Sequence, residues 1–123
     1  MPDCDTCTRE DMSKAQLLFT QQESLLCDSH EGASLWPCHA CGRLFVHVWR
    51  EVGGWEIEDI WRYWAPVAPA EVDALRAAFA RDGDDGMARA TALLLSRRHL
   101  VESPTHAVYW SASDHEIGLW MHT

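Results

Sequence analysis

The sequence predicts a mixed α+β domain that combines a β-sheet with an N-terminal helix, a central helical pair and a C-terminal β-hairpin. The first observation is the run from Arg43 to Val52, where both alternating sets of side chains are largely apolar, as in a strand covered on both faces. The second is Gly53-Gly54, a hairpin signal followed by a strand-like run from Trp55 to Trp64. The third is the helical spacing of apolar residues between positions 69 and 98. Strands and helices in separate runs are typical of an α+β domain.

The N-terminal third is expected to hold one helix and one short strand. Residues 8–11 resemble a capping box and predict a helix over residues 9–22. Ser24 to Cys27 predicts a short strand, and residues 28–34 predict a polar loop that contains Gly32. The following run from Arg43 should be central in the sheet because both of its faces are apolar.

Two prolines mark the change from strands to helices. Pro66 and Pro69 should end the second long strand, and Pro69 should begin a helix over residues 69–81 that ends near Gly83. Asp84-Asp85 then predicts the start of a second helix that continues to about Arg98. We expect these helices to pack as an antiparallel pair.

The last part of the chain is expected to close the sheet. Ser103-Pro104 should break the chain before a hairpin formed by residues 106–111 and 116–122. The length of 123 residues predicts a single domain. In that domain, residues 1–64 would contain the cysteine pairs, the first helix and the main hairpin. Residues 65–100 would contain the helical pair, and residues 101–123 the closing hairpin.

The chain is strongly acidic, with 19 Asp and Glu against 10 Lys and Arg and a formal net charge of -9. Non-specific nucleic-acid binding depends on clustered basic side chains, so no nucleic-acid partner is expected. A basic protein suits this charge better as a partner. The sequence has no 18-residue apolar run and no basic N-terminus followed by an apolar core, so it predicts no membrane span, no signal peptide and a cytoplasmic location.

Four of the five cysteines form two C-x-x-C pairs, Cys4 with Cys7 and Cys38 with Cys41. A structural zinc ion takes four tetrahedral ligands, and two such pairs supply four thiolates. Gly42 directly follows the second pair and lets the backbone fold around the sulfurs. This pattern suits metal binding in a reducing compartment better than a disulfide framework. We therefore predict a structural Zn²⁺ site with these four cysteines as its ligands.

Two other uses of the cysteines stay open. Cys27 and His30, three residues apart, are candidates to replace the first pair as partners of Cys38 and Cys41. In the preferred arrangement, Cys27 is instead a core cysteine at the end of a strand. The functional alternative is thiol redox chemistry at the first pair, because a C-x-x-C pair next to a helix start favours the thiolate.

The remaining polar residues assemble no further catalytic site. His106, His115 and His122 fall in the predicted closing hairpin near Asp114 and Glu116, and we expect them on its outward face. The chain has no Gly-rich phosphate loop and no nucleophile elbow, so no kinase or hydrolase constellation is predicted.

The seven tryptophans are expected mainly in the core. A surplus on the surface would form an aromatic patch of the kind found at protein-binding hot spots. Acidic side chains around Gly53-Gly54 would supply its rim, namely Glu51, Glu56, Glu58 and Asp59.

The second cysteine pair, followed by Gly42 and an apolar strand, resembles the second knuckle of zinc-ribbon proteins, including small bacterial ones, and Cys4 with Cys7 resembles the partner knuckle. The resemblance implies a zinc-ribbon-like sheet over about a third of the chain. The sequence departs from the usual ribbon because it has no glycine after Cys7 and a predicted helix in place of a hairpin. Ribbons serve many functions, so the resemblance by itself selects none.

The leading hypothesis is a non-enzymatic, zinc-binding interaction module, of the kind of an acidic immunity or inhibitor protein that masks a basic partner. The alternative is a metal- or thiol-dependent enzyme that uses Cys4 and Cys7 or an open zinc position. A further alternative is a transcription-associated zinc ribbon, which would need a local basic surface.

Overall fold

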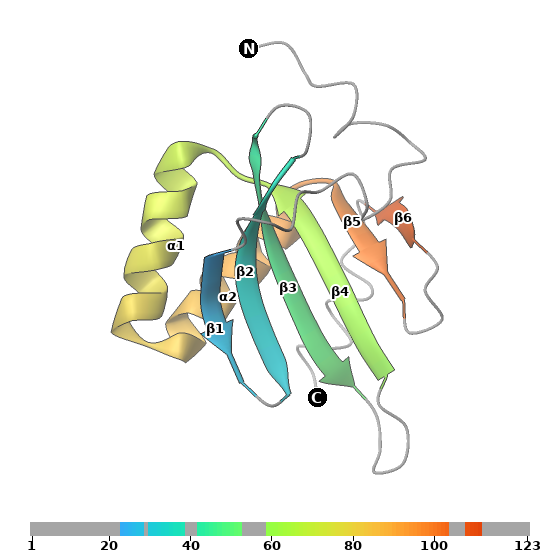
Figure 1. Ribbon diagram of the computed structural model, residues 1–123, viewed down its shortest axis with the longest axis horizontal. Coiled ribbons are helices and arrows are strands. Elements are labelled where there is room, and N and C mark those ends of the chain that lie inside the picture. Colours follow the sequence, from blue (N-terminus) through green and yellow to red (C-terminus); the bar gives the residue numbers. More distant parts are fainter. Residues whose placement is uncertain (1–22, 29, 39–41, 53–58, 104–107, 112–123) are drawn as a thin grey trace.

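The computed structural model (Figure 1) describes residues 23–28, 30–38, 42–52, 59–103 and 108–111. These segments form an antiparallel sheet and two helices, which confirms the mixed α+β class. The strands follow one another across the sheet in sequence order, and the helices are inserted between the fourth and fifth strands. The elements are β1 (Glu23–Cys27), β2 (Glu31–Pro37), β3 (Leu44–Val52), β4 (Asp59–Pro66), α1 (Pro69–Arg81), α2 (Gly83–Leu95), β5 (His99–Glu102) and β6 (Val108–Ser111).

Strand β3 lies inside the sheet, as its two apolar faces predicted. It pairs with β2 from Glu31↔Arg50 to Pro37↔Leu44, and with β4 over almost its whole length. The β1 strand confirms the predicted strand at residues 24–27 and forms one edge of the sheet, next to β2. Each strand of the sheet therefore pairs with the strands that come before and after it in the sequence.

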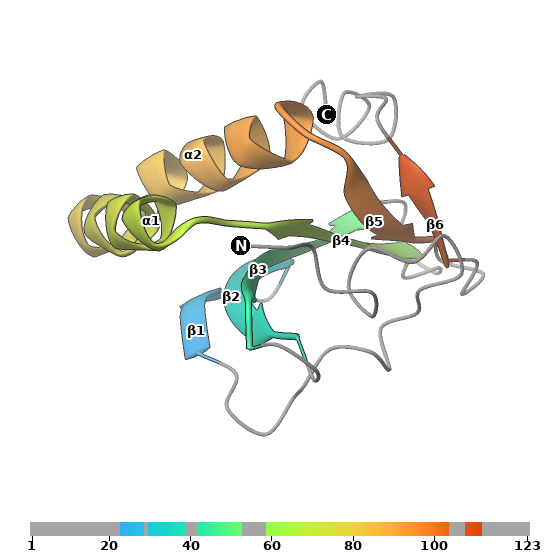
Figure 2. The ribbon, with the colours of Figure 1, turned by 90° about the horizontal axis from the view of Figure 1, so that it is seen from above.

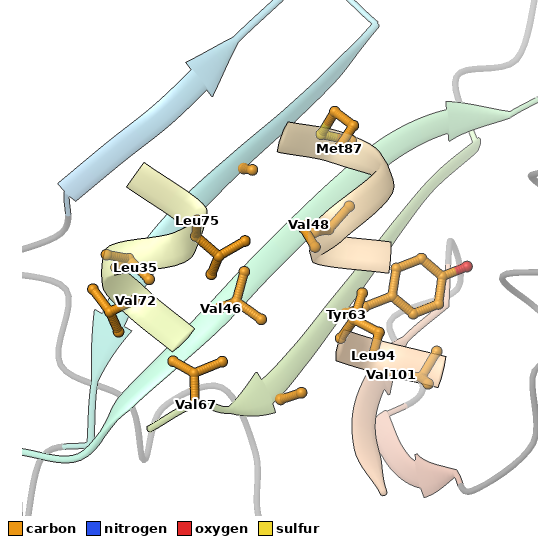
Figure 3. Close-up of a cluster of buried hydrophobic side chains, with 13 residues drawn as sticks. Leu35, Val46, Val48, Tyr63, Val67, Val72, Leu75, Met87, Leu94 and Val101 are labelled. Carbon is orange, nitrogen blue, oxygen red and sulfur yellow. The ribbon is translucent and has the colours of Figure 1, made fainter. Parts of the chain in front are cut away.

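Both helices lie on the same face of the sheet (Figure 2). Side chains of β2, β3 and β4 that point to this face pack against side chains of α1 and α2 in one core (Figure 3). Its members from the sheet include Leu35, Val46, Val48 and Tyr63, and those from the helices include Val72, Leu75, Met87 and Leu94.

A second apolar cluster lies on the opposite face of the sheet. Alternation along the strands directs these side chains away from the helices. The cluster contains Trp36, Cys38, Phe45, Trp64 and Leu100, with Trp110 packed against it. The strands β2 to β5 are therefore buried on both faces, which explains the nearly continuous apolar sequence of β3.

The helix starts follow local sequence signals. Pro69 occupies the first turn of α1, and the Glu71 carboxylate accepts the Ala68 N–H at 2.8 Å. The cap of α2 is Asp82, whose carboxylate accepts the Asp84 N–H at 2.9 Å, and not the predicted Asp84-Asp85 pair. Asp84 and Asp85 lie instead in the first turn, where negative charge also favours the helix.

The predicted polar loop over residues 28–34 is wrong for Glu31 to Ser34, which begin β2. These residues lack an apolar pattern, but β1 and β3 both supply backbone partners for them. The absence of a side chain at Gly32 also has a structural use, because a Cβ there would overlap the Trp49 ring across the strand pair. Tertiary pairing therefore overrides the local turn signal.

The second helix is shorter than predicted, and an unpredicted strand follows it. Helix α2 ends at Leu95 with Ser96 as its cap, and His99–Glu102 form β5. β5 pairs with β4 and with β6, so the predicted strand at residues 106–111 is confirmed for 108–111 but has β5 as its neighbour.

Several predicted elements lie outside the described residues: the helix over 9–22, the start of the run from Trp55, and the second half of the closing hairpin at 116–122. Among the helices that the structure describes, none is long and apolar enough to cross a membrane.

Candidate functional site

Cys38, the described member of the second cysteine pair, directly follows β2. The Cys38 N–H donates to the Arg43 carbonyl oxygen at 2.8 Å, and the Gly42 N–H donates to the Cys38 carbonyl oxygen at 2.9 Å. Gly42 has φ of +76°, a conformation that a residue with a Cβ rarely adopts. The backbone on both sides of residues 39–41 is thus closed into a tight turn, as a metal knuckle requires.

Cys38 is 1% exposed and belongs to the apolar cluster on the sheet face away from the helices. Its side chain follows those of Ser34 and Trp36 along the same face, because alternate residues of a strand point the same way. Any metal held by Cys38 would therefore be bound on this face, beside aromatic rings.

Of the four predicted zinc ligands, the structure places only Cys38. Cys4, Cys7 and Cys41 lie outside the described residues. Within the described part of the chain, no group of three or more His, Cys, Asp or Glu side chains is arranged to hold a metal ion. The proposed zinc site thus depends on ligands that residues 23–28, 30–38, 42–52, 59–103 and 108–111 do not supply.

The alternative ligand pair, Cys27 and His30, does not lie near Cys38. Cys27 pairs with Gly32 at the start of β2, and Cys38 follows the end of that strand. Cys38 comes six positions after Gly32 along the extended chain, which corresponds to about 20 Å. Two sulfurs bound to one zinc ion lie within about 4.6 Å of each other. The structure therefore rules out one ion shared by Cys27 and Cys38.

Cys27 is at a strand end, as predicted, but it is exposed and not part of a core. His30 is also exposed, and its Nδ1 lies 3.5 Å from the Glu51 carboxylate. The surroundings of Cys27 and His30 are thus those of a solvent-exposed hairpin end.

The sequence prediction missed a polar network on the same sheet face as Cys38, centred on His47 of β3. His47 is 1% exposed and pairs directly with Ser34 on β2 and Trp64 on β4. Its Nδ1 lies 3.1 Å from Ser34 Oγ, which also accepts the Trp36 indole N–H at 2.9 Å. The His47 ring is also stacked on the Trp64 ring, with centroids 4.8 Å apart.

Arg62 continues this network across β4. Its Nη1 lies 3.5 Å from His47 Nε2, and its Nε lies 3.6 Å from the Glu102 carboxylate of β5. A guanidinium can only donate, so Nε2 faces it as an acceptor and Nδ1 carries the hydrogen that is donated to Ser34. The two ring nitrogens of His47 therefore face polar side chains, Ser34 on one side and Arg62 on the other.

A sequence signal for this network existed in β3. Phe45, His47 and Trp49 alternate on the face away from the helices, and a histidine between two aromatic residues in a buried strand must find polar neighbours. Those neighbours come from other strands, and only the register of the sheet identifies them.

A second buried histidine lies at the start of β5. His99 is 1% exposed, its Nδ1 lies 3.1 Å from the Arg97 carbonyl oxygen, and its ring packs edge-on to Tyr63. The carbonyl fixes the tautomer with hydrogen on Nδ1. These contacts hold the start of β5 in place after α2. His99 lies on the sheet face that α1 and α2 cover, away from Cys38.

Two carboxylates have lowered pKa values because arginines bind them. The Arg97 guanidinium and the Ala68 N–H lower the pKa of Glu71 to about 2. Hydrogen bonds from Arg76 lower the pKa of Glu23. Both pairs hold elements together, α1 to the end of α2 and β1 to α1, and neither lies in the network around His47.

The predicted histidines of the closing hairpin, His106, His115 and His122, lie outside the described residues, as do Asp114, Glu116, Glu56 and Glu58. No family model, no curated protein and no solved structure matches the chain. The function is therefore argued from the chain's own residues.

Proposed function

We propose that this chain is a zinc-stabilised, acidic binding module that docks on a basic protein, in the manner of an immunity or inhibitor protein, and catalyses no reaction. The zinc-ribbon-like part would bind one Zn²⁺ through Cys4, Cys7, Cys38 and Cys41. The ion would be structural, because four thiolates leave no position for water or substrate.

The geometry of the turn at Cys38 supports the zinc part of the proposal. The turn has a left-handed glycine after the second cysteine position and backbone hydrogen bonds on both sides of the pair. Cys38 belongs to the cluster on the sheet face away from α1 and α2, so the other ligands of the proposed zinc ion would have to come to this face.

The observation that carries the binding proposal is that several arginines already bind acidic or aromatic side chains of this protein. Arg76, Arg81 and Arg97 each bind a carboxylate of this protein, namely Glu23, Asp85 and Glu71. Arg98 lies over the Trp110 ring, 4.6 Å from its centroid. These contacts leave the excess of acid uncompensated, which favours a basic partner and disfavours nucleic acid.

The experiment is affinity capture from the cells that make the protein, followed by measurement of the purified pair. We expect a partner of net positive charge whose Kd weakens at least tenfold between 50 and 300 mM salt. A variant with Glu31→Gln, Asp73→Asn and Asp84→Asn should bind more weakly, because it lacks three negative charges.

The matched control is Arg89→Gln, which removes an exposed positive charge on α2 and should bind at least as tightly as the unchanged chain. A Kd that changes neither with the salt concentration nor with these charge substitutions would contradict the proposal. The enzyme alternative would instead require a zinc held by three protein ligands, and the transcription-associated ribbon would require salt-sensitive affinity for DNA.

A further inference from the structure

Arg62 differs from Arg76 and Arg97 in how weakly its guanidinium contacts a carboxylate. Arg76 and Arg97 each make two hydrogen bonds of 2.7 to 2.9 Å to a single carboxylate. Arg62 faces a carboxylate too, but its two contacts are 3.5 and 3.6 Å long. A distance of 3.6 Å is outside the range of a good hydrogen bond. The protein contacts of the Arg62 guanidinium are thus longer and weaker than those of Arg76 and Arg97.

Buried groups fix the position of this guanidinium. Glu102, directly opposite Arg62 on β5, has a side chain that is 5% exposed, and His47 is 1% exposed. The Arg62 side chain itself is 33% exposed. The contacts use Nε and Nη1, and within the described part of the chain Nη2 meets no acceptor. The edge of the Arg62 guanidinium that carries Nη2 therefore remains available for an oxyanion.

Trp49 stands beside Arg62 as its direct cross-strand neighbour on β3, half-buried on the same face. Gly32 of β2 lies on the other side of Trp49, and its missing side chain leaves room for the indole ring. Arginine and tryptophan are enriched in binding hot spots, since arginine supplies a directed charge and tryptophan a rigid apolar surface.

From this geometry we propose that Arg62 and Trp49 form a binding site for a carboxylate carried on an apolar or aromatic body. Glu102 and His47 act as positioning residues, because they aim the guanidinium without contacting the ligand. A carboxylate suits the site better than a phosphate, because a chain of net charge -9 repels a dianion more strongly than a monoanion. The site goes beyond the proposed docking function and does not depend on it.

The test is a titration followed by the ¹H–¹⁵N signals of the arginine Nε–H and tryptophan indole N–H groups. Benzoate should produce saturable shifts at Arg62 and Trp49, while acetate, which lacks the apolar body, and inorganic phosphate should each bind at least tenfold more weakly. A short peptide that ends in Phe, compared with its C-terminal amide, distinguishes a peptide carboxylate from a free acid as the source.

Variants identify the residues. Arg62→Lys keeps the charge without the fork and should weaken benzoate binding at least tenfold, with the melting temperature retained. Trp49→Leu should remove the preference for benzoate over acetate. Arg89→Gln, on the exposed side of α2, should change nothing. Shifts that do not saturate, binding retained in Arg62→Lys, or equal weakening in Arg89→Gln would overturn the proposal.

Discussion

At the scale of single residues, the ion pair of Glu71 and Arg97 joins three parts of the described chain. The two Arg97 Nη atoms donate to the two carboxylate oxygens at 2.8 and 2.7 Å, and Nη1 also donates to the Pro66 carbonyl oxygen. One guanidinium thus joins the start of α1, the segment after α2 and the end of β4. Both side chains are about 30% exposed, so solvent screens the pair only in part.

The pH dependence of stability should report this pair. The pKa of Glu71 in the folded chain, about 2, is below its ordinary value of 4.5, so its stabilisation is present above pH 4.5 and is lost as the pH falls towards 2. We expect Glu71→Gln to lower the free energy of unfolding by about 1 kcal/mol at pH 7. The difference from the unchanged chain should vanish in acid, measured by urea unfolding at several pH values.

The pair of Glu23 and Arg76 provides the matched comparison. Its geometry is equally short, but its side chains are 43% and 48% exposed. Glu23→Gln should therefore cost less than Glu71→Gln at pH 7. Equal stability of Glu71→Gln and the unchanged chain at pH 7 would show that the Arg97 contact contributes nothing net.

At the scale of elements, the sequence predicted those helices and strands whose formation depends on local chemistry. Pro69 and the spacing of Val72 and Leu75 predicted α1 correctly, and apolar side chains in both alternating sets predicted β3. Strand β5 was missed because His99 and Glu102 are polar and the strand has four residues, so only pairing with β4 and β6 makes it a strand. For the candidate site, the spacing of the cysteines selected Cys38 and Gly42 for a zinc site that stays a prediction. The network around His47 could not be predicted in this way, because it depends on sheet register.

The contact between α1 and α2 yields a prediction at this scale. A Cβ on Gly86 would overlap the Phe79 ring, whereas a Cβ on Gly83 would meet only Leu26 Cδ1 at 3.5 Å. Alanine is otherwise the better helix former, so a destabilising Gly86→Ala must reflect the close approach of the helices. We expect Gly86→Ala to lower the free energy of unfolding by about 1–3 kcal/mol, measured by chemical denaturation.

Gly83→Ala in the first turn of the same helix is the control, and it should be neutral or stabilising. Adding Phe79→Leu to Gly86→Ala should restore part of the lost free energy of unfolding, because leucine occupies less space than phenylalanine. If both glycine variants behave alike, the helix pair tolerates a wider separation than the structure shows.

At the scale of the whole molecule, two apolar clusters share one sheet. The cluster on the helix face is held by α1 and α2, which follow each other directly in the sequence. The cluster on the other face ends at Cys38, and the proposed zinc would link that point to Cys4 and Cys7, some thirty positions earlier in the chain. Closing so long a loop gives a metal site a large influence on the stability of a small domain.

The proposed zinc site therefore predicts both a stoichiometry and a location for its effect. Native mass spectrometry of protein purified without chelator should show one Zn²⁺ per chain, which Cys38→Ser loses and Cys27→Ser retains. Removing the metal should speed amide hydrogen exchange at Cys38 and Gly42, whose N–H groups close the knuckle turn, more than in α1 and α2. Protein without metal, or zinc retained in Cys38→Ser, would contradict the site. Exchange that rises equally in the turn and in both helices would instead show that the metal supports the fold as one cooperative unit, with no local role at the second face of the sheet.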